Sequence, residues 1–144
     1  MTGITRPVPV PDEVSAPFWE AAGRHVLTLA RCARCGAFAH PPDAVCRECG
    51  SADPGFEFVE VDGAGTVRSW TVMRQSFLPG FDADVPFVLV DVELAAAPGV
   101  RLIGRLLDGP LAPLRTGLPV TLAFEDLGPG LSVPAFELAP AGEA

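Results

Sequence analysis

The stretch that decides the fold of the first fifty residues is Cys32-Ala-Arg-Cys35-Gly together with Cys46-Arg-Glu-Cys49-Gly. Two residues between paired cysteines let both sulfurs bind one ion, and the glycine after each pair supplies the backbone freedom that closes the turn. Two such pairs complete a four-thiolate site, for which the expected ion is Zn²⁺. Because four protein sulfurs fill the coordination sphere, we interpret this zinc as structural rather than catalytic.

Other chemistries of the four cysteines are less consistent with the sequence. Disulfides are typical of exported proteins, and the chain begins without a signal-peptide core. A thioredoxin-type redox site needs a single Cys-x-x-Cys in a βαβ unit. A four-thiolate iron site has the same ligands as zinc, so the choice between zinc and iron stays open. His40 lies between the two pairs and is interpreted as a surface residue.

The chain has 144 residues, with ten arginines, no lysine and eighteen acidic residues, for a formal net charge of −8. The first fifty residues carry five charges of each sign, so the net charge lies wholly in residues 51–144. That charge argues against a nucleic-acid-binding protein. The apolar content of 49% predicts a surface that a partner covers. No apolar run approaches the ~20 residues of a membrane helix, so we expect a cytoplasmic protein without membrane contact.

The expected secondary structure is one short helix followed by strands. The helix is predicted over residues 16–24 with Ser15 as its N-cap, and a strand over 26–31 leads into the first cysteine pair. Alternating patterns predict five further strands over 65–74, 86–94, 100–107, 119–125 and 131–137. Pro134 predicts that the last of these is an edge strand. The pattern favours a small β-barrel or sandwich.

Two groups of aromatic residues each have two interpretations. Phe18 and Trp19 on the short helix pack either on the protein's own core or on a partner. The connection between residues 74 and 86 is long for a hairpin and carries Phe77 and Phe81. These two rings either plug one end of the barrel or need a partner or ligand to cover them.

Residues suited to catalysis are scarce. The chain has two histidines and no lysine or tyrosine, and all four cysteines are assigned to the metal. It contains no Gly-rich phosphate loop, nucleophile elbow or His-Glu-x-x-His motif. We therefore predict that the protein is not an enzyme on its own. Arginines beside the cysteines either offset the negative charge of the site or bind a phosphorylated ligand; these are Arg31, Arg34 and Arg47.

Several motifs together resemble a family of acyl-CoA-associated proteins with an N-terminal rubredoxin-like zinc ribbon and a C-terminal OB-fold. In the first part they are Pro17-Phe18-Trp19, the run from Leu27 to Gly36, Pro41-Pro42, and the run from Cys46 to Ser51. In the second part they are the runs from Gly65 to Val72, from Val85 to Phe87, and from Gly99 to Leu102. One departure is that residues 108–117 are too short and proline-rich for the helix of a typical OB-fold.

The resemblance implies a mainly β fold in four parts: an arm and short helix over 1–25, a zinc ribbon over 26–52, a five-stranded OB-like barrel over 53–140, and a tail over 141–144. It implies a non-catalytic accessory subunit that binds and stabilises a thiolase-superfamily enzyme, such as a retro-aldolase acting on steroid side-chain acyl-CoA. A hydratase is a further implied partner. The same subunit would also fit an acyltransferase or an acetoacetyl-CoA- or HMG-CoA-forming complex.

Candidate site residues follow from these patterns and from the resemblance. The metal ligands are Cys32, Cys35, Cys46 and Cys49. Expected contacts of a CoA thioester shared with the partner are Arg74, Phe77 and Phe81. Expected contacts of the partner itself are Phe18, Trp19, Phe38 and Trp70. A rival function is binding of single-stranded nucleic acid on aromatic platforms, which OB-folds often perform, and the acidic barrel disfavours it.

Overall fold

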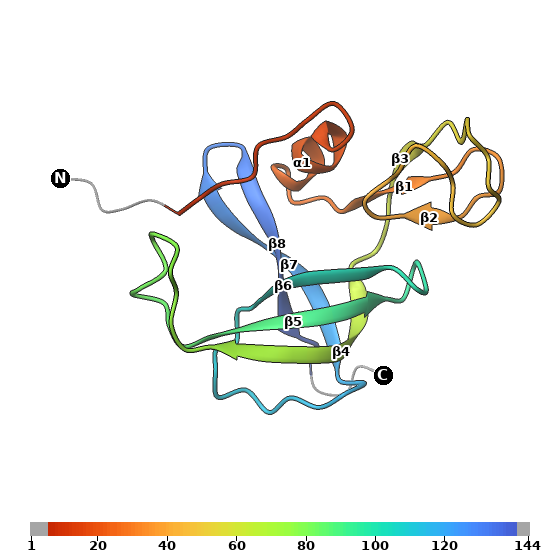
Figure 1. The fold of residues 1–144 in the computed structure, drawn as a ribbon. Helices are drawn as coiled ribbons and strands as arrows, with labels where there is room; N and C mark the ends of the chain where they lie inside the picture. Colours follow the sequence, from red (N-terminus) through yellow and green to blue (C-terminus); the bar gives the residue numbers. More distant parts are fainter. Residues whose placement is uncertain (1–5, 141–144) are drawn as a thin grey trace.

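The computed structural model describes residues 6–140, so part of the predicted arm (1–5) and the predicted tail (141–144) lie outside the described residues. Within this range the chain forms one helix and eight strands (Figure 1). The elements are α1 (Ala16–Ala22), β1 (Thr28–Arg31), β2 (Phe38–Ala39), β3 (Glu57–Glu60), β4 (Ala64–Met73), β5 (Phe87–Leu94), β6 (Arg101–Leu106), β7 (Pro119–Gly128) and β8 (Leu131–Leu138). None of the described helices is long and apolar enough to cross a membrane.

The last five strands form a closed barrel in the order β4-β5-β6-β8-β7. All neighbouring pairs are antiparallel except β6 and β8, and β4 closes the barrel by pairing with β7 over Ala64–Thr66. This order confirms the predicted five-stranded OB-like barrel. Residues 107–118 connect β6 to β7 without a helix, as their length and prolines predicted.

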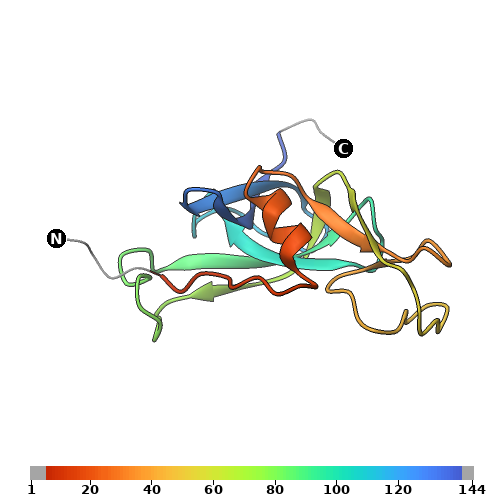
Figure 2. The same cartoon turned by 90° about the horizontal axis from the view of Figure 1, so that it is seen from above.

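The barrel core comes from the alternation that the sequence displays. On β5, Val88, Val90, Val92 and Leu94 are buried, because every second residue of a strand faces the same side. The buried cluster continues into Phe18 of α1 and into Leu27 and Leu29 at β1. Figure 2 shows α1 lying across the barrel strands. The helix and the ribbon therefore share one continuous core with the barrel.

The ribbon contains a three-stranded sheet with the order β2-β1-β3. The strand predicted over 26–31 corresponds to β1, and Ala30 pairs with Ala39 on one side and with Phe58 on the other. The sequence did not predict β2 or β3 as strands. Since β3 lies beyond residue 52, pairing to the ribbon extends past the boundary that we predicted between ribbon and barrel, and that division stays a prediction.

The edge position predicted for the last strand is wrong, because β8 lies between β6 and β7. Pro134 is tolerated because no hydrogen bond between the strands requires an N–H at this position. The Phe136 carbonyl accepts a hydrogen bond from Leu107 on the β6 side, and Pro134 has the same alternation as Phe136. The parallel pairing with β6 begins only at Ala135, so the proline removes no hydrogen bond from the β6–β8 ladder.

The helix starts through a different side chain from the one we predicted. Ser15 occupies the N-cap position but makes no capping hydrogen bond with its side chain. Instead, the Asp12 carboxylate accepts from the Ser15 N–H at 2.7 Å, while the Ser15 hydroxyl accepts from the Asp12 N–H at 3.1 Å. This reciprocal pair fixes the turn that leads into α1.

Candidate functional site

The two cysteine pairs form matching turns at one end of the ribbon. Cys32 follows β1 directly, and the Gly36 N–H donates to its carbonyl at 2.8 Å. The Gly50 N–H donates to the Cys46 carbonyl at the same distance. Gly36 and Gly50 have φ angles of 79° and 75°, a region that favours glycine. The glycine after each pair therefore closes the turn, as the sequence predicted.

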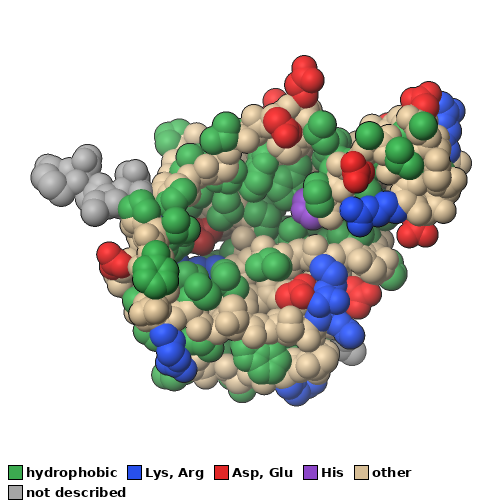
Figure 3. All heavy atoms as spheres, in the orientation of Figure 1, with side chains coloured by type: hydrophobic (Ala, Val, Ile, Leu, Met, Phe, Trp, Pro, Cys, Tyr) green, Lys and Arg blue, Asp and Glu red, His purple; other side chains and the backbone are tan. Residues whose placement is uncertain are grey.

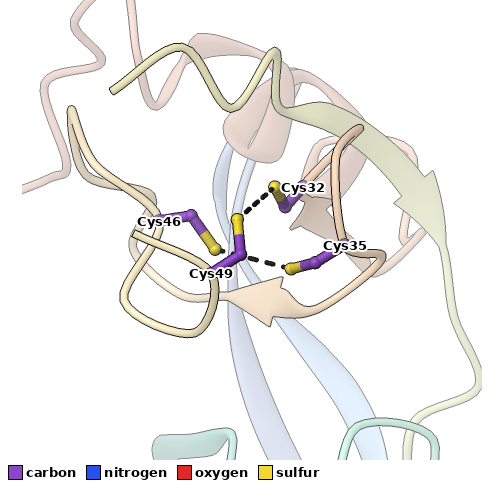
Figure 4. Close-up of side chains that lie close together, drawn as sticks. All are labelled: Cys32, Cys35, Cys46 and Cys49. Atoms are coloured by element: carbon purple, nitrogen blue, oxygen red, sulfur yellow. Dashed lines mark hydrogen bonds between the residues drawn. The ribbon is translucent and has the colours of Figure 1, made fainter. Parts of the chain in front are cut away.

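The four sulfurs converge on one point, as Figure 4 shows. Cys32 Sγ lies 3.9 Å from Cys49 Sγ, Cys35 Sγ lies 3.7 Å from Cys46 Sγ, and all four ligand atoms lie within 4.8 Å of one another. A tetrahedron with Zn–S bonds of ~2.3 Å has edges of ~3.8 Å, whereas a disulfide needs ~2.05 Å. The arrangement therefore fits a four-coordinate metal.

The pKa values of two of the thiols, those of Cys46 and Cys35, are shifted by their surroundings. Backbone N–H groups, first that of Cys49 and then that of Glu48, help lower the pKa of Cys46 to about 7. At Cys35 the Ala37 N–H acts in the same direction, but desolvation and the neighbouring sulfurs outweigh it and raise the pKa to about 12. Four adjacent thiolates repel one another without a cation, and zinc binds all four in the ionised form.

Two of the arginines beside the metal ligands are already paired with carboxylates. Arg34 donates to the Asp53 carboxylate at 3.1 Å and to the Asp53 carbonyl at 2.9 Å. Arg47 lies 3.8 Å from Asp43. These contacts favour a role in local charge balance over a phosphate-binding role. His40 packs its ring against Phe18 with 4.9 Å between centroids, and desolvation lowers its pKa, so it is partly buried rather than a simple surface residue.

The four residues predicted to contact a partner differ in exposure. Phe18 is buried in the shared core, which supports the first interpretation of this ring. Trp19 and Phe38 are partly buried against the same core. Trp70, on β4, keeps 42% of its surface exposed. Of the four, Trp70 is therefore the side chain most available to another molecule, and a partner contact at any of them stays a prediction.

The long β4–β5 connection separates its two phenylalanines. Phe77 is 92% exposed, whereas Phe81 stacks on Phe87 of β5 with ring centroids 5.7 Å apart. Arg6 from the N-terminal arm lies over the Phe81 ring, 4.6 Å from its centroid. Phe81 therefore packs back on the barrel and Phe77 does not, and Arg74 precedes both as an exposed residue.

Sequence reasoning missed a charge cluster that anchors this connection. Arg6 forms ion pairs with Asp84 and with Glu125, the latter at 2.7 Å. Arg105 reaches the same two carboxylates at 3.3 and 3.6 Å. No side chain of the four is more than 29% exposed. The cluster joins the arm, the β4–β5 connection, β6 and β7. No local sequence pattern predicted it.

The cluster lies in a largely apolar groove of about 420 Å³. The arm, α1, β5, β6 and the β7–β8 hairpin surround it, with walls that include Pro7, Pro9, Trp19, Phe87, Ile103 and Val133. Figure 3 shows a hollow on this side of the molecule lined mainly by hydrophobic side chains. The groove and the metal centre are separate features, since no cysteine or other ribbon residue lines the groove.

Comparison with known proteins gives consistent matches to both parts of the chain. Residues 19–55 match the family described as "ChsH2, rubredoxin-like zinc ribbon domain", and residues 58–125 match "ChsH2, C-terminal OB-fold domain". A chain of the solved structure named "Ltp2-ChsH2(DUF35) aldolase" is 34% identical with a TM-score of 0.76, covering 90% of this chain and 98% of that chain.

Two further relatives extend the comparison. A DUF35-family protein of unknown function from Sulfolobus solfataricus is 15% identical with a TM-score of 0.57, covering 88% of this chain and 86% of that one, and it shows a likeness of fold alone. A "Probable enoyl-CoA hydratase alpha subunit" from Thermomonospora curvata is 35% identical over 131 residues, or 91% of this chain. The chain spans 39% of the length of that curated relative.

Proposed function

The chain belongs to the ChsH2 family of proteins that join a rubredoxin-like zinc ribbon to an OB-fold domain, and from this premise we propose that it is an accessory subunit of a thiolase-superfamily acyl-CoA enzyme. The proposed complex cleaves or forms a carbon–carbon bond, as in the retro-aldol step of steroid side-chain degradation. The observation that carries the proposal is 34% identity over nearly the whole of a chain from a structure named as an aldolase.

A non-catalytic role agrees with the side chains that the structure brings together. Ser132, Asp126 and His25 form one hydrogen-bonded cluster. Ser132 Oγ and His25 Nε2 each lie 2.6 Å from Asp126 Oδ1. In a serine-type catalytic triad the histidine contacts the nucleophile directly. Here the carboxylate stands between the two, so His25 is not positioned to activate the Ser132 hydroxyl, and Ser132 is only 2% exposed. We therefore assign the catalytic residues to the partner.

Zinc has a structural role in this proposal. Cys32, Cys35, Cys46 and Cys49 would hold the ion, which crosslinks two turns that have little core of their own. Structural sites of this kind supply roughly 10–16 kcal/mol of apparent binding free energy in peptides. Because the buried cluster runs from the ribbon into the barrel, loss of the metal would loosen α1 as well as the ribbon.

Two finer assignments belong to the same proposal. Arg74 and Phe77 are proposed contacts of the CoA thioester, since both are exposed on the β4–β5 connection. Phe81 is a less direct contact because it packs on Phe87. A hydratase is a proposed second partner, since a longer protein named as a hydratase subunit contains a region 35% identical to this chain.

The test is co-expression of the chain with a candidate thiolase-superfamily partner, followed by size-exclusion chromatography, metal analysis and product analysis. We expect one complex with one zinc per chain. Cys46→Ser should lose the metal and the complex, whereas Val45→Ala, at an exposed neighbouring position, should retain both. Full metal content and full complex formation by both Cys35→Ser and Cys46→Ser would contradict the proposal. Acyl transfer without carbon–carbon cleavage would favour an acyltransferase complex instead.

A further inference from the structure

Hydrogen bonds close the barrel over only part of β4. Its first residues pair with β7, and Val67 then exchanges two backbone hydrogen bonds with the loop before β7, at Gly117 and Leu118. From Ser69 to Met73 the strand pairs with β5 alone among the described residues. We call this segment, Ser69–Met73, the open edge. The β6–β7 loop runs on the same side of β4 (Figure 1), and its backbone bonds to β4 are confined to Val67.

The alternation of the sheet shows which backbone groups are unpaired on the open edge. Leu94 donates to the Val100 carbonyl across the β5–β6 pair, so Val90 and Val88, of the same alternation, also turn their N–H and C=O groups toward β6. Trp70 stands opposite Val90, and Val72 stands opposite Val88. Two residues directly opposite each other in an antiparallel pair either exchange backbone hydrogen bonds or both point their N–H and C=O groups away from the partner strand. The backbone groups of Trp70 and Val72 therefore point away from β5.

The open edge lacks the usual protection against strand pairing. Natural edge strands commonly carry a charge, a proline or a bulge that discourages another strand. The five residues Ser69-Trp-Thr-Val-Met73 contain no charge and no proline. The one bulge in the β4–β5 pair occurs at Arg68, before the segment begins. Ser69, Trp70 and Thr71 are exposed. Two donors and two acceptors are thus available in strand geometry.

We propose that an extended segment of the partner subunit adds a strand to β4 along the open edge, an inference that rests on the proposed function. Unpaired backbone groups in strand geometry are matched best by another extended backbone, and alternate side chains then supply specificity. The exposed Trp70 ring calls for an apolar side chain on the partner strand. Arg74 and Arg68 flank the segment, and since Arg68 lies 3.8 Å from Glu93, an acidic residue on the partner strand beside Arg74 would complement it best.

A second copy of this chain is a poorer occupant. When Trp70 pairs with Val72 of a copy, antiparallel register places Arg68 opposite Arg74 at both ends, and directly opposed like charges destabilise a sheet. Each copy also carries a formal net charge of −8, which opposes association of two copies. The charges therefore favour a different polypeptide over self-pairing.

The test measures amide hydrogen exchange at single residues in the full-length chain, alone and in the co-purified complex. The Trp70 and Val72 amides should exchange at least ~10-fold more slowly in the complex. The Thr71 amide should change little, because it already faces β5. Val72→Pro removes an outward N–H without removing a β4–β5 hydrogen bond, and it should weaken partner affinity about tenfold. Leu111→Pro, on the exposed β6–β7 loop, is the matched control and should bind normally.

The outcomes separate this inference from the proposed function. A complex that forms without slower exchange at Trp70 and Val72 would overturn the open edge as the docking site and leave the accessory role intact. Failure to form any complex would remove both proposals. Slower exchange at the same two amides in a concentrated sample of the chain alone, with a dimer in analytical ultracentrifugation, would overturn the partner strand in favour of a second copy. Amide hydrogen exchange of the wild-type chain tests the docking proposal even if Val72→Pro does not fold.

Discussion

Replacing Arg6 with Gln should destabilise the protein far more than its position near the start of the chain suggests. The guanidinium forms ion pairs with Asp84 and Glu125 and donates to the Gly80 carbonyl at 3.3 Å. Its side chain is 19% exposed, so solvent screens these contacts less than those of a surface pair. Hydrogen bonds to charged groups contribute about 1.5–3 kcal/mol each, and Arg105 would still neutralise both carboxylates in part.

From these contacts we expect Arg6→Gln to lower the free energy of unfolding by about 2 kcal/mol. Urea unfolding of the zinc-loaded protein measures this change, and amide exchange over residues 76–86 should rise because Arg6 also covers Phe81. Arg34→Gln is the matched control, since its pair with Asp53 is 57% and 88% exposed and should contribute about 0–1 kcal/mol. Equal effects of the two substitutions would refute the view that the Arg6 cluster anchors the arm and the β4–β5 connection.

Two further predictions concern single side chains. Hydrogen bonds from Ser132 and then His25 lower the pKa of Asp126 from 3.8. A carboxylate whose pKa is lowered in the folded state stabilises the fold at pH values above its unfolded-state pKa. That contribution is lost as the pH falls through the folded-state pKa. The stability difference between wild type and Asp126→Asn, followed by urea unfolding, should therefore shrink as the pH falls below 3.8; a constant difference would contradict it. Phe77→Ala should leave thermal stability unchanged, because the ring is 92% exposed, yet weaken binding of a CoA thioester to the complex in calorimetry; unchanged affinity would remove Phe77 from the proposed contacts.

Local patterns predicted the metal centre and most of the barrel. The cysteine spacing encodes the site within eighteen residues, so no distant contact was needed to infer it. Strand β5 was also predicted from the sequence, because Val88, Val90 and Val92 alternate with less buried residues. Strands β2 and β3 were not predicted. Strand β2 has only two residues, and the sequence of β3, Glu-Phe-Val-Glu, does not alternate between apolar and polar residues. Both are stabilised as strands by pairing with β1.

The features that sequence reasoning could not reach depend on contacts between distant residues. Arg6 and Glu125 are 119 positions apart, and Arg6 and Asp84 are 78 apart. Phe77 and Phe81 belong to one loop and have the same side chain, and the contacts of Phe81 with Arg6 and Phe87 distinguish the two rings. The open edge was also hidden, because strand pairing depends on where β7 leaves β4.

The shared core explains why a metal at one end of the molecule should matter for a surface at the other. Leu29 of β1 and Phe18 of α1 belong to the same buried cluster as Val90 of the barrel. The C-terminal end of α1 lies close to the β7–β8 turn, since a Cβ on Gly23 would clash with the Gly130 carbonyl oxygen. A ribbon without metal would loosen β1 and then α1, and α1 forms part of one wall of the apolar groove through Trp19. The metal centre should therefore stabilise a groove wall that it does not touch, and removal of zinc should disturb α1 more than the barrel itself.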